Sequence, residues 1–368
     1  MTKRTARLLG GVMACAFATS GLPAASLAQQ QAQPAEFYAG KQITIIVGVN
    51  AGGTVDTLAR TFAGYLTKHI PGHPTFIVSN MVGAGGLVAT NYIGERAAKD
   101  GLNLNFQNLD PLAQVLGNQG LRVRYDQLEF VGGIADTRTN YARTDSIPGG
   151  LKTPADIMKA QGIAVGAYNN TDISGLLAKL SLDVLGVKHK FITGYRGGQD
   201  IFLAMQRGEV QFQNTSLGTL RTRSASFLKS GEGIAISYLA TIDKQGRFER
   251  NKHIAEMPAF PDLYHQIHGK LPSGPEWDAF NWLIEQFGDL AFAMFAPPGT
   301  PAPALDALRK GYAAAMADPD LVAHAIKTTG LPYDPVSAEK GKAVLAGLSG
   351  VSPAILETVR KSIEALGK

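Results

Sequence analysis

The sequence predicts an α/β fold, and three observations support this prediction. The run from Ile43 to Val49 is apolar, β-branched and uncharged, as expected of a strand that is covered on both faces. The glycine pair Gly52-Gly53 follows it, and a stripe of apolar residues with helical spacing comes next. Short apolar runs then alternate with helical patterns along the chain. A length of 368 residues, 45% of them hydrophobic, suggests two domains.

The first strand, glycine turn and helix form a candidate anion site. Glycines turn the chain without a steric penalty from Cβ and expose backbone N–H groups. Thr54 or Asp56 can cap the helix that follows. Such a turn at a helix N-terminus favours anions, and in an open α/β sheet it lies where ligands bind. The alternative is an ordinary turn in which Asp56 acts foremost as a cap, because a carboxylate would repel an anionic ligand.

A second stretch repeats this arrangement. Residues 76–79 form a short predicted strand, Gly83-Ala84-Gly85-Gly86 is a glycine turn, and residues 87–98 form a predicted helix. Two such units side by side suggest two amide-lined loops facing one pocket. Each unit taken alone is equally consistent with an ordinary turn.

The N-terminus has the pattern of a secretory signal peptide, residues 1–28. A basic start is followed by a short apolar stretch and by the small-residue cleavage site Ser26-Leu27-Ala28. Cleavage there removes Lys3, Arg4 and Arg7 and lowers the formal net charge from +5 to +2, so the charge is weak evidence for nucleic-acid binding. Cys15 lies inside the signal, so the mature chain lacks disulfides, thiolate metal sites and a cysteine nucleophile. Residues 29–39 are polar and predicted to be disordered.

The rest of the chain continues the alternation of strands and helices. Residues 140–143 are interpreted as the crossing into a second lobe, residues 253–275 as irregular, and three C-terminal helices as starting near Thr300, Ser337 and Ser352. Further strands are predicted at residues 102–106, 130–134, 163–166, 191–192, 210–213, 234–239 and 291–296.

Three polar loops of the second half follow predicted strands. The loop 167–175 precedes a helix at 176–185, and Tyr195-Arg196-Gly197-Gly198 precedes a helix at 200–207. The strand at 210–213 opens on Asn214, Thr215 and Ser216. Arg196 either pairs with a second ligand carboxylate or braces the site from outside.

The order of motifs resembles the extracytoplasmic solute-binding receptors of tripartite tricarboxylate transporters, the Bug or TctC family. The resemblance covers residues 43 to about 363, and its motifs are weak singly but specific in their order. They are Ala51-Gly52-Gly53-Thr54-Val55-Asp56, Gly83-Ala84-Gly85-Gly86, Asp100-Gly101, Tyr195-Arg196-Gly197-Gly198, Gly208-Glu209-Val210, Ala296-Pro297-Pro298-Gly299-Thr300-Pro301 and Ala317-Asp318-Pro319.

The resemblance implies a two-lobed periplasmic-binding-protein type II fold. Each lobe is a mainly parallel sheet flanked by helices, with the ligand cleft between the lobes. Lobe one would hold residues 40–141 and 256–368, and lobe two residues 142–255. The family further implies a periplasmic monomer that captures a small organic carboxylate for membrane permease subunits, without catalysis, cofactor, metal or nucleic acid.

The resemblance also carries over a set of ligand-binding residues. They lie in the loops after the strands of both lobes: Gly52, Gly53, Thr54, Asp56, Gly83, Ala84, Gly85, Gly86, Asn170, Thr171, Ser174, Tyr195, Arg196, Gly197, Gly198, Asn214 and Ser216. The chain departs from the family pattern at Gly48-Val49-Asn50, at Asn80-Met81-Val82 and at Asn169-Asn170-Thr171-Asp172, which leaves the identity of the carboxylate open.

Other functions have weaker support in the sequence. A dinucleotide fingerprint needs a third glycine where Val88 stands, and no Gly-x-Ser-x-Gly elbow of a serine hydrolase occurs. His265 and His268 are expected to be solvated surface residues, and Trp277 and Trp282 to pack in the core or at a lobe edge rather than to form a stacking platform. The alternative from another class is a secreted α/β hydrolase or lyase acting on a small carboxylate or ester.

Overall fold

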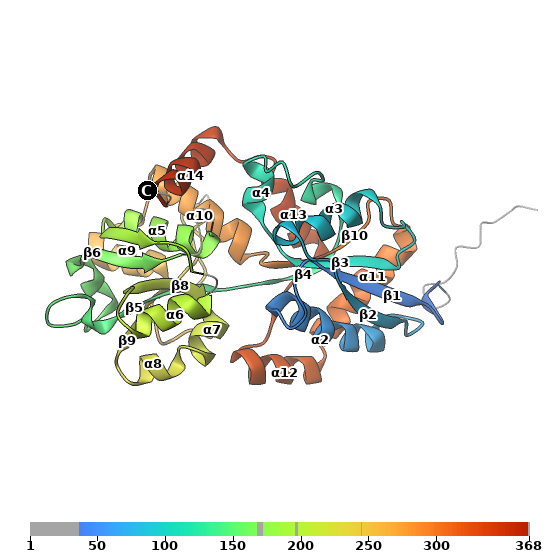
Figure 1. The fold of residues 1–368 in the computed structure, drawn as a ribbon, viewed down its shortest axis with the longest axis horizontal. Coiled ribbons are helices and arrows are strands. Elements are labelled where there is room, and N and C mark those ends of the chain that lie inside the picture. Colours follow the sequence, from blue (N-terminus) through green and yellow to red (C-terminus); the bar gives the residue numbers. More distant parts are fainter. Residues whose placement is uncertain (1–36, 168–171, 196–197, 244, 367–368) are drawn as a thin grey trace, which may run out of the picture. The chain divides into compact units, whose positions relative to one another are not determined.

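The computed structural model describes residues 37–366, except residues 168–171, 196–197 and 244. Two β-sheets with helices packed on them make up this part of the chain (Figure 1). The α/β class predicted from the sequence is therefore confirmed.

The first sheet has six strands in the order β11-β4-β10-β3-β1-β2. Strands β1, β2 and β3 are parallel, whereas β10 runs antiparallel to both β3 and β4, so β1 to β4 end at the same edge. The strands are β1 (Gln42–Val47), β2 (Thr75–Asn80), β3 (Asn103–Asn108), β4 (Glu129–Ala135), β10 (Phe292–Ala296) and β11 (Asp334–Val336).

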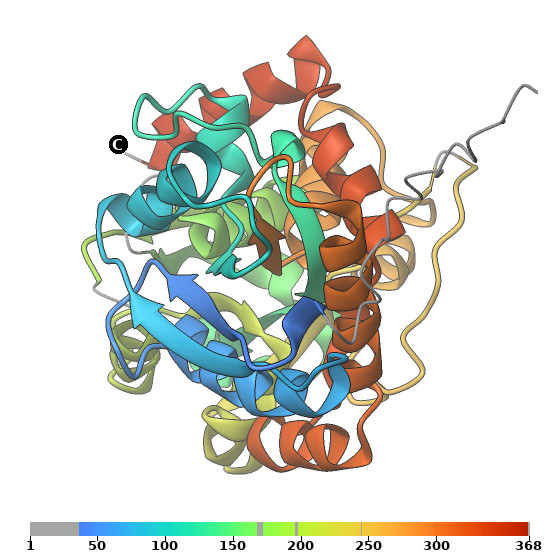
Figure 2. The same ribbon diagram turned by 90° about the vertical axis from the view of Figure 1, so that its right-hand side faces the viewer.

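Helices cover both faces of this sheet because its strands are apolar on both sides. Ile43 and Ile45 belong to the hydrophobic cluster with α2 and α11, and Ile46 belongs to the cluster with α3 and α4. Figure 2 shows helices on both sides of these strands. The helices are α2 (Thr54–His69), α3 (Leu87–Glu95), α4 (Pro111–Val115), α11 (Ala302–Met316), α12 (Pro319–Thr329) and α13 (Ala338–Gly347).

The second sheet has five strands in the order β7-β6-β8-β5-β9. Strands β6, β7 and β8 are parallel, and β5 runs antiparallel to β8 and β9. The start of β5 therefore lies at the edge where β6 to β9 end. The strands are β5 (Arg138–Arg143), β6 (Gln161–Gly166), β7 (Lys188–Ile192), β8 (Phe212–Ser216) and β9 (Gly233–Tyr238).

Ala142 and Tyr141 show how the second sheet is covered on both faces. Ala142 lies in the cluster with α5, and Tyr141 lies in the cluster with α6, α7 and α8. Helices α10 and α14 pack against α5. The helices are α5 (Ile173–Leu185), α6 (Gly198–Gln206), α7 (Leu217–Thr222), α8 (Ala225–Lys229), α9 (Phe260–His268), α10 (Pro275–Gly288) and α14 (Pro353–Leu366). The short 3₁₀ turns are η1 (Ala84–Gly86), η2 (Tyr125–Gln127), η3 (Thr144–Ser146) and η4 (Pro154–Lys159).

Four local predictions are wrong. Residues 140–143 belong to strand β5, because Asn140 and Tyr141 pair with β8 and β9. Asn214 and Ser216 lie inside β8, not in a loop after it. The stretch 253–275 contains α9, whose Pro261 occupies the first turn, where a missing N–H costs nothing. The C-terminal region holds a fourth helix, α12, which Asp318 caps.

Only Asp136 and Thr137 lie between β4 of the first sheet and β5 of the second, and the chain returns to the first sheet through the longer segment between β9 and β10. The predicted change of lobe between residues 141 and 142 falls inside β5, and α10 and α14, assigned to lobe one, pack against α5. The assignment of residues to two lobes remains a prediction. Within the described residues, no helix combines the length and apolarity that crossing a bilayer requires.

Gly48 allows the end of β1 to touch the second glycine turn. A Cβ atom built on Gly48 would lie 2.4 Å from the Cα of Gly86, which is closer than real Cβ contacts come. The Cα of Gly86 belongs to the backbone, and a Cβ on Gly48 would have no torsion of its own, so neither atom could rotate away. The contact therefore requires glycine at position 48.

We expect Gly48→Ala to destabilise the fold by about 1–3 kcal/mol, as overpacking does. The matched control is Gly64→Ala inside α2, where a Cβ meets no atom within 4 Å. This control should stabilise the helix by up to about 1 kcal/mol. Urea unfolding of both variants measures the difference, and equal stabilities for the two would contradict the close approach.

Candidate ligand-binding site

Most of the predicted site residues that the structure describes lie at one edge of each sheet. Gly52 and Gly83 follow the ends of β1 and β2, and Ser174 follows β6. Ser216 is the last residue of β8. Ligands of open α/β sheets bind at these carboxyl edges.

Asp56 holds the first glycine turn together from its place in the first turn of α2. Its side chain is 2% exposed and accepts the Gly52 N–H at 2.8 Å. Arg60 donates to it from Nε (3.0 Å) and Nη2 (2.9 Å), and Asn80 donates from Nδ2 (2.9 Å). The ends of β1 and β2 and the start of α2 are thus tied to one carboxylate.

These bonds change the role expected for the glycine N–H groups. The Gly52 N–H donates to Asp56, and the Gly53 N–H donates to the carbonyl oxygen of Asn50 at 3.2 Å. Both donors are used within the turn. The first N–H groups of α2, those of Thr54 and Val55, have no acceptor inside the helix, and no side chain caps this end. They are the better anion donors of this turn.

The second glycine turn has a left-handed backbone. Ala84, Gly85 and Gly86 have φ angles of 47°, 66° and 99°, and Ala84 is one of two non-glycine residues with positive φ in the described chain. The Gly83 carbonyl oxygen accepts the Gly86 N–H at 2.9 Å, which closes the turn. Strain of this kind at an exposed alanine is typical of functional turns. The exposed Ala84 and Gly85 are therefore retained as candidates.

Arg138 dominates the edge of the second sheet, although the sequence analysis did not select it. Its side chain is 10% exposed. Nε donates to Asn214 Oδ1 at 3.0 Å, and Nη2 donates to Ser174 Oγ at 2.7 Å. Two predicted ligand-binding residues thus hold an arginine. The guanidinium also lies 5.8 Å from the centre of the Phe287 ring.

A row of buried polar side chains lies beside Arg138 in the second sheet. Asn140 pairs with Asn214 on one side and with Ser237 on the other. Asn214 donates from Nδ2 to Asn140 Oδ1 at 2.9 Å, so both ends of its amide have partners. Within the described residues, the buried hydroxyl of Ser237 has no partner. Asn214 therefore orients Arg138, and a polar group next to the row would satisfy Ser237.

Asp136 is the carboxylate that faces Arg138. Arg138 Nη1 donates to Asp136 Oδ2 at 3.3 Å, which is long for a bond between two charged groups. Burial raises the pKa of Asp136 above its ordinary value, and the lowering effects of Arg138 do not offset this. Arg138 therefore has a weak counterion.

The other predicted residues of the second sheet have local roles in the structure. Asp172 caps α5 and accepts the Ser174 N–H at 2.9 Å, while Ser216 caps α7 and accepts the Thr219 N–H at 3.1 Å. Tyr195 is half-buried beside the α6 cluster, and burial raises its pKa. The Gly198 carbonyl oxygen accepts from Gln213. Asn170, Thr171, Arg196 and Gly197 lie outside the described residues.

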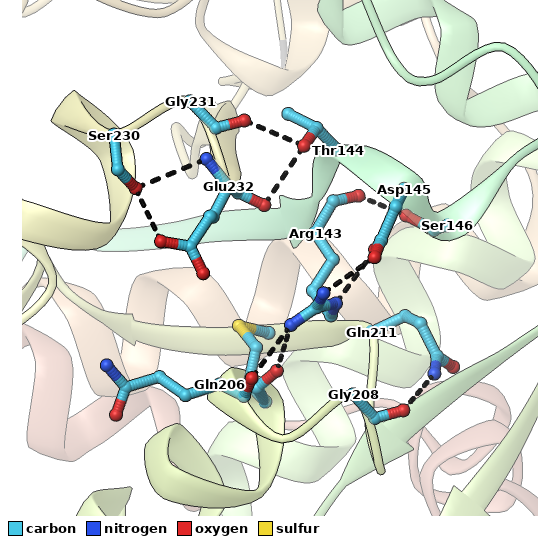
Figure 3. Close-up of polar contacts among 11 residues, drawn as sticks. Arg143, Thr144, Asp145, Ser146, Gln206, Gly208, Gln211, Ser230, Gly231 and Glu232 are labelled. Atoms are coloured by element: carbon cyan, nitrogen blue, oxygen red, sulfur yellow. Dashed lines mark hydrogen bonds and ion pairs between the residues drawn. The ribbon is translucent and has the colours of Figure 1, made fainter.

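Arg143 stands at the opposite end of β5 and has a structural role (Figure 3). It pairs with Asp145 through Nε (2.8 Å) and Nη2 (2.6 Å). Nη1 donates to the carbonyl oxygens of Met205 and Gln206 at the end of α6, where a positive charge favours the helix dipole. The N–H groups of Arg143 thus bind a carboxylate and the carbonyl groups at the end of a helix.

A cavity of about 920 Å³ lies between the segment 241–249, α10 and the start of α14. None of the predicted site residues lines it. Asp243, Asp278, Glu285 and Asp289 do, and Arg247, also in the lining, pairs with Asp243. This wall would repel a carboxylate. Among the described residues, no group of three or more His, Cys, Asp and Glu side chains is arranged to hold a metal ion.

The expectations for the histidines and tryptophans are confirmed. His265 and His268 are exposed on α9. Trp277 and Trp282 are buried in the main hydrophobic cluster, and Trp277 stacks on Phe260 with ring centres 6.0 Å apart.

Comparisons with known proteins show which solved structures share this fold. No protein-family model matches the chain. A curated relative, the UPF0065 protein in the TAR-I ttuE-ttuC' intergenic region of Agrobacterium vitis, is 25% identical over 347 residues, which are 92% of this chain and 88% of the relative. A TctC solute-binding protein from Polaromonas, solved without ligand, has a TM-score of 0.64 at 20% identity and covers 88% of this chain and 99% of its own.

This is the fold of the TctC-type solute-binding proteins. MatC from Rhodopseudomonas palustris, solved with bound malate, has a TM-score of 0.55 at 19% identity and covers 89% of this chain and 99% of its own. The resemblance that the sequence motifs indicated is thus confirmed at the level of the fold.

Acid should weaken the contribution of Asp56 to stability. Its pKa is held below the ordinary value, first by the hydrogen bonds of Arg60 and then by the Gly52 N–H. A lowered folded-state pKa means that the stabilisation is complete above the ordinary pKa and is lost as the pH falls from about 5 through the folded-state pKa, so that only part of it remains at pH 2. We expect Asp56→Asn to cost about 2 kcal/mol at pH 7 and much less at pH 2.

Urea unfolding of wild type and Asp56→Asn at several pH values measures whether their free energies of unfolding approach each other as the pH falls. Asp320→Asn is the control, because that side chain is 78% exposed. A difference between wild type and Asp56→Asn that stays constant from pH 7 to pH 2 would contradict the role given to the carboxylate.

Proposed function

We propose that this protein is a solute-binding receptor that captures a small organic carboxylate and passes it to the membrane subunits of a tripartite tricarboxylate-type transporter. The observation that best supports this proposal is the common position of the candidate residues. In both sheets they lie at the edge where the parallel strands end, and the fold matches a TctC solute-binding protein over most of both chains.

The chemistry of this edge supports an anionic ligand. The uncapped start of α2 offers the N–H groups of Thr54 and Val55 at the positive end of a 16-residue helix. Arg138 adds a positive charge with a weak counterion at the edge of the second sheet. Bound malate in MatC, a protein of the same fold, agrees with a carboxylate ligand.

The remaining parts of the proposal concern location and partners. The N-terminal signal pattern and the fold support a periplasmic protein, and the permease as partner follows from the family resemblance. The protein would act by binding rather than by catalysis. We propose that it does so as a monomer whose two lobes close on the ligand.

We expect one carboxylate of a mono-, di- and tricarboxylate panel to bind one-to-one and to raise the melting temperature. A ligand at a hundredfold excess over its dissociation constant stabilises the folded state by about 2.7 kcal/mol. Thermal shift followed by calorimetry measures this. Incubation with a panel of esters is the control, since turnover there would favour a hydrolase, and binding to none of the carboxylates would reject the proposal.

A further inference from the structure

We propose that Arg138 binds a second anionic group of the ligand, which makes this site selective for dicarboxylates. The inference rests on the proposed function and deepens it. In this arrangement the first carboxylate lies at the N-terminus of α2. The second lies against the Arg138 guanidinium.

The position of Arg138 is the first argument. It begins β5 opposite Ser216, the last residue of β8, so it stands at the carboxyl edge of the second sheet. Asn140, on the same face of β5, is fully buried, whereas the Arg138 side chain keeps 10% of its surface exposed. The guanidinium thus stands at the border between the interior and the ligand edge.

The donor count is the second argument. A guanidinium has five N–H groups in a planar fork. Arg138 has three acceptors within the described residues: Asn214 for Nε, Asp136 for Nη1 and Ser174 for Nη2. One N–H on each terminal nitrogen is therefore left, and a carboxylate can accept such N–H groups.

The choice of partners is the third argument. Other arginines of the described chain pair with a carboxylate through two nitrogens: Arg122 with Glu95, Arg143 with Asp145 and Arg250 with Asp262. Arg138 instead contacts two neutral oxygens and one distant carboxylate oxygen. Arg309 also has a neutral partner and a carboxylate oxygen at 3.3 Å, so the choice of partners supports the proposal only together with the position and the remaining donors of Arg138. Neutral partners orient the fork and leave most of its charge for a ligand.

Chain-matched pairs of acids test the proposal by calorimetry. The probes are succinate with butyrate, glutarate with pentanoate, and adipate with hexanoate, because each pair differs only in one terminal carboxylate. Wild type should prefer one dicarboxylate over its partner by at least about tenfold, as expected of a charge-assisted contact. Arg138→Gln should remove this preference and leave the affinity for the monocarboxylate within about threefold. Arg138→Lys should keep part of it, since the charge remains without the fork.

Two further variants separate binding from folding. Arg143→Lys is the matched control on the same strand, and it should lower the melting temperature without changing the preference. Asp136→Asn should tighten dicarboxylate binding by about threefold or more, because it removes a carboxylate that competes for Arg138. If Arg138→Gln does not fold, the dicarboxylate affinity of Asp136→Asn tests the proposal instead.

Three results would overturn the inference. They are equal wild-type affinity for both members of every pair, equal losses for both members in folded Arg138→Gln, and an unchanged or weaker dicarboxylate affinity in Asp136→Asn. In each case monocarboxylate binding by wild type would leave the proposed receptor function intact. Binding to none of the six acids nor to any other carboxylate would instead reject the receptor function itself.

Discussion

The buried carboxylate of Asp56 is the interaction on which the first sheet depends. One side chain receives the Gly52 N–H, the Arg60 guanidinium and the Asn80 amide, and so fixes two strand ends and a helix start at once. A charge that is buried with this many donors needs no further counterion. The hydrogen bonds to Asp56 therefore fix the conformation of the glycine turn. The N–H groups at the uncapped start of α2 take no part in these bonds and can bind another group.

The two sheets offer a ligand different kinds of contact. The first sheet offers backbone N–H groups and a turn with three left-handed residues, and such N–H groups can donate hydrogen bonds to any carboxylate. The second sheet offers a side-chain cation that Asn214 and Ser174 orient. A site built from oriented polar side chains rejects analogues that lack the matching group, because its own groups are then left unpaired. In the proposed site, affinity and selectivity would thus arise from different sheets.

The predictions of strands, turns and helices from the sequence were correct where the local residue pattern and the tertiary contacts agree. The strand, turn and helix at 43–69 and the second unit at 76–95 follow from β-branched runs, glycines and helical spacing. Strand β5 was missed because Arg138, Asn140 and Arg143 interrupt its apolar pattern, and several of their polar partners lie 36 or more positions away along the chain. Arg138 could have been found as a charged residue beside a predicted buried strand, but its contacts with Ser174 and Asn214 are visible only in three dimensions.

The short connection between the sheets has a mechanical consequence. Three peptide units join Ala135, the end of β4, to Arg138, so the two Cα atoms are never more than roughly 11 Å apart. This limit holds for every orientation that one sheet can take relative to the other. The backbone of Arg138 therefore cannot move away from the end of β4, whatever positions the residues farther from this connection take.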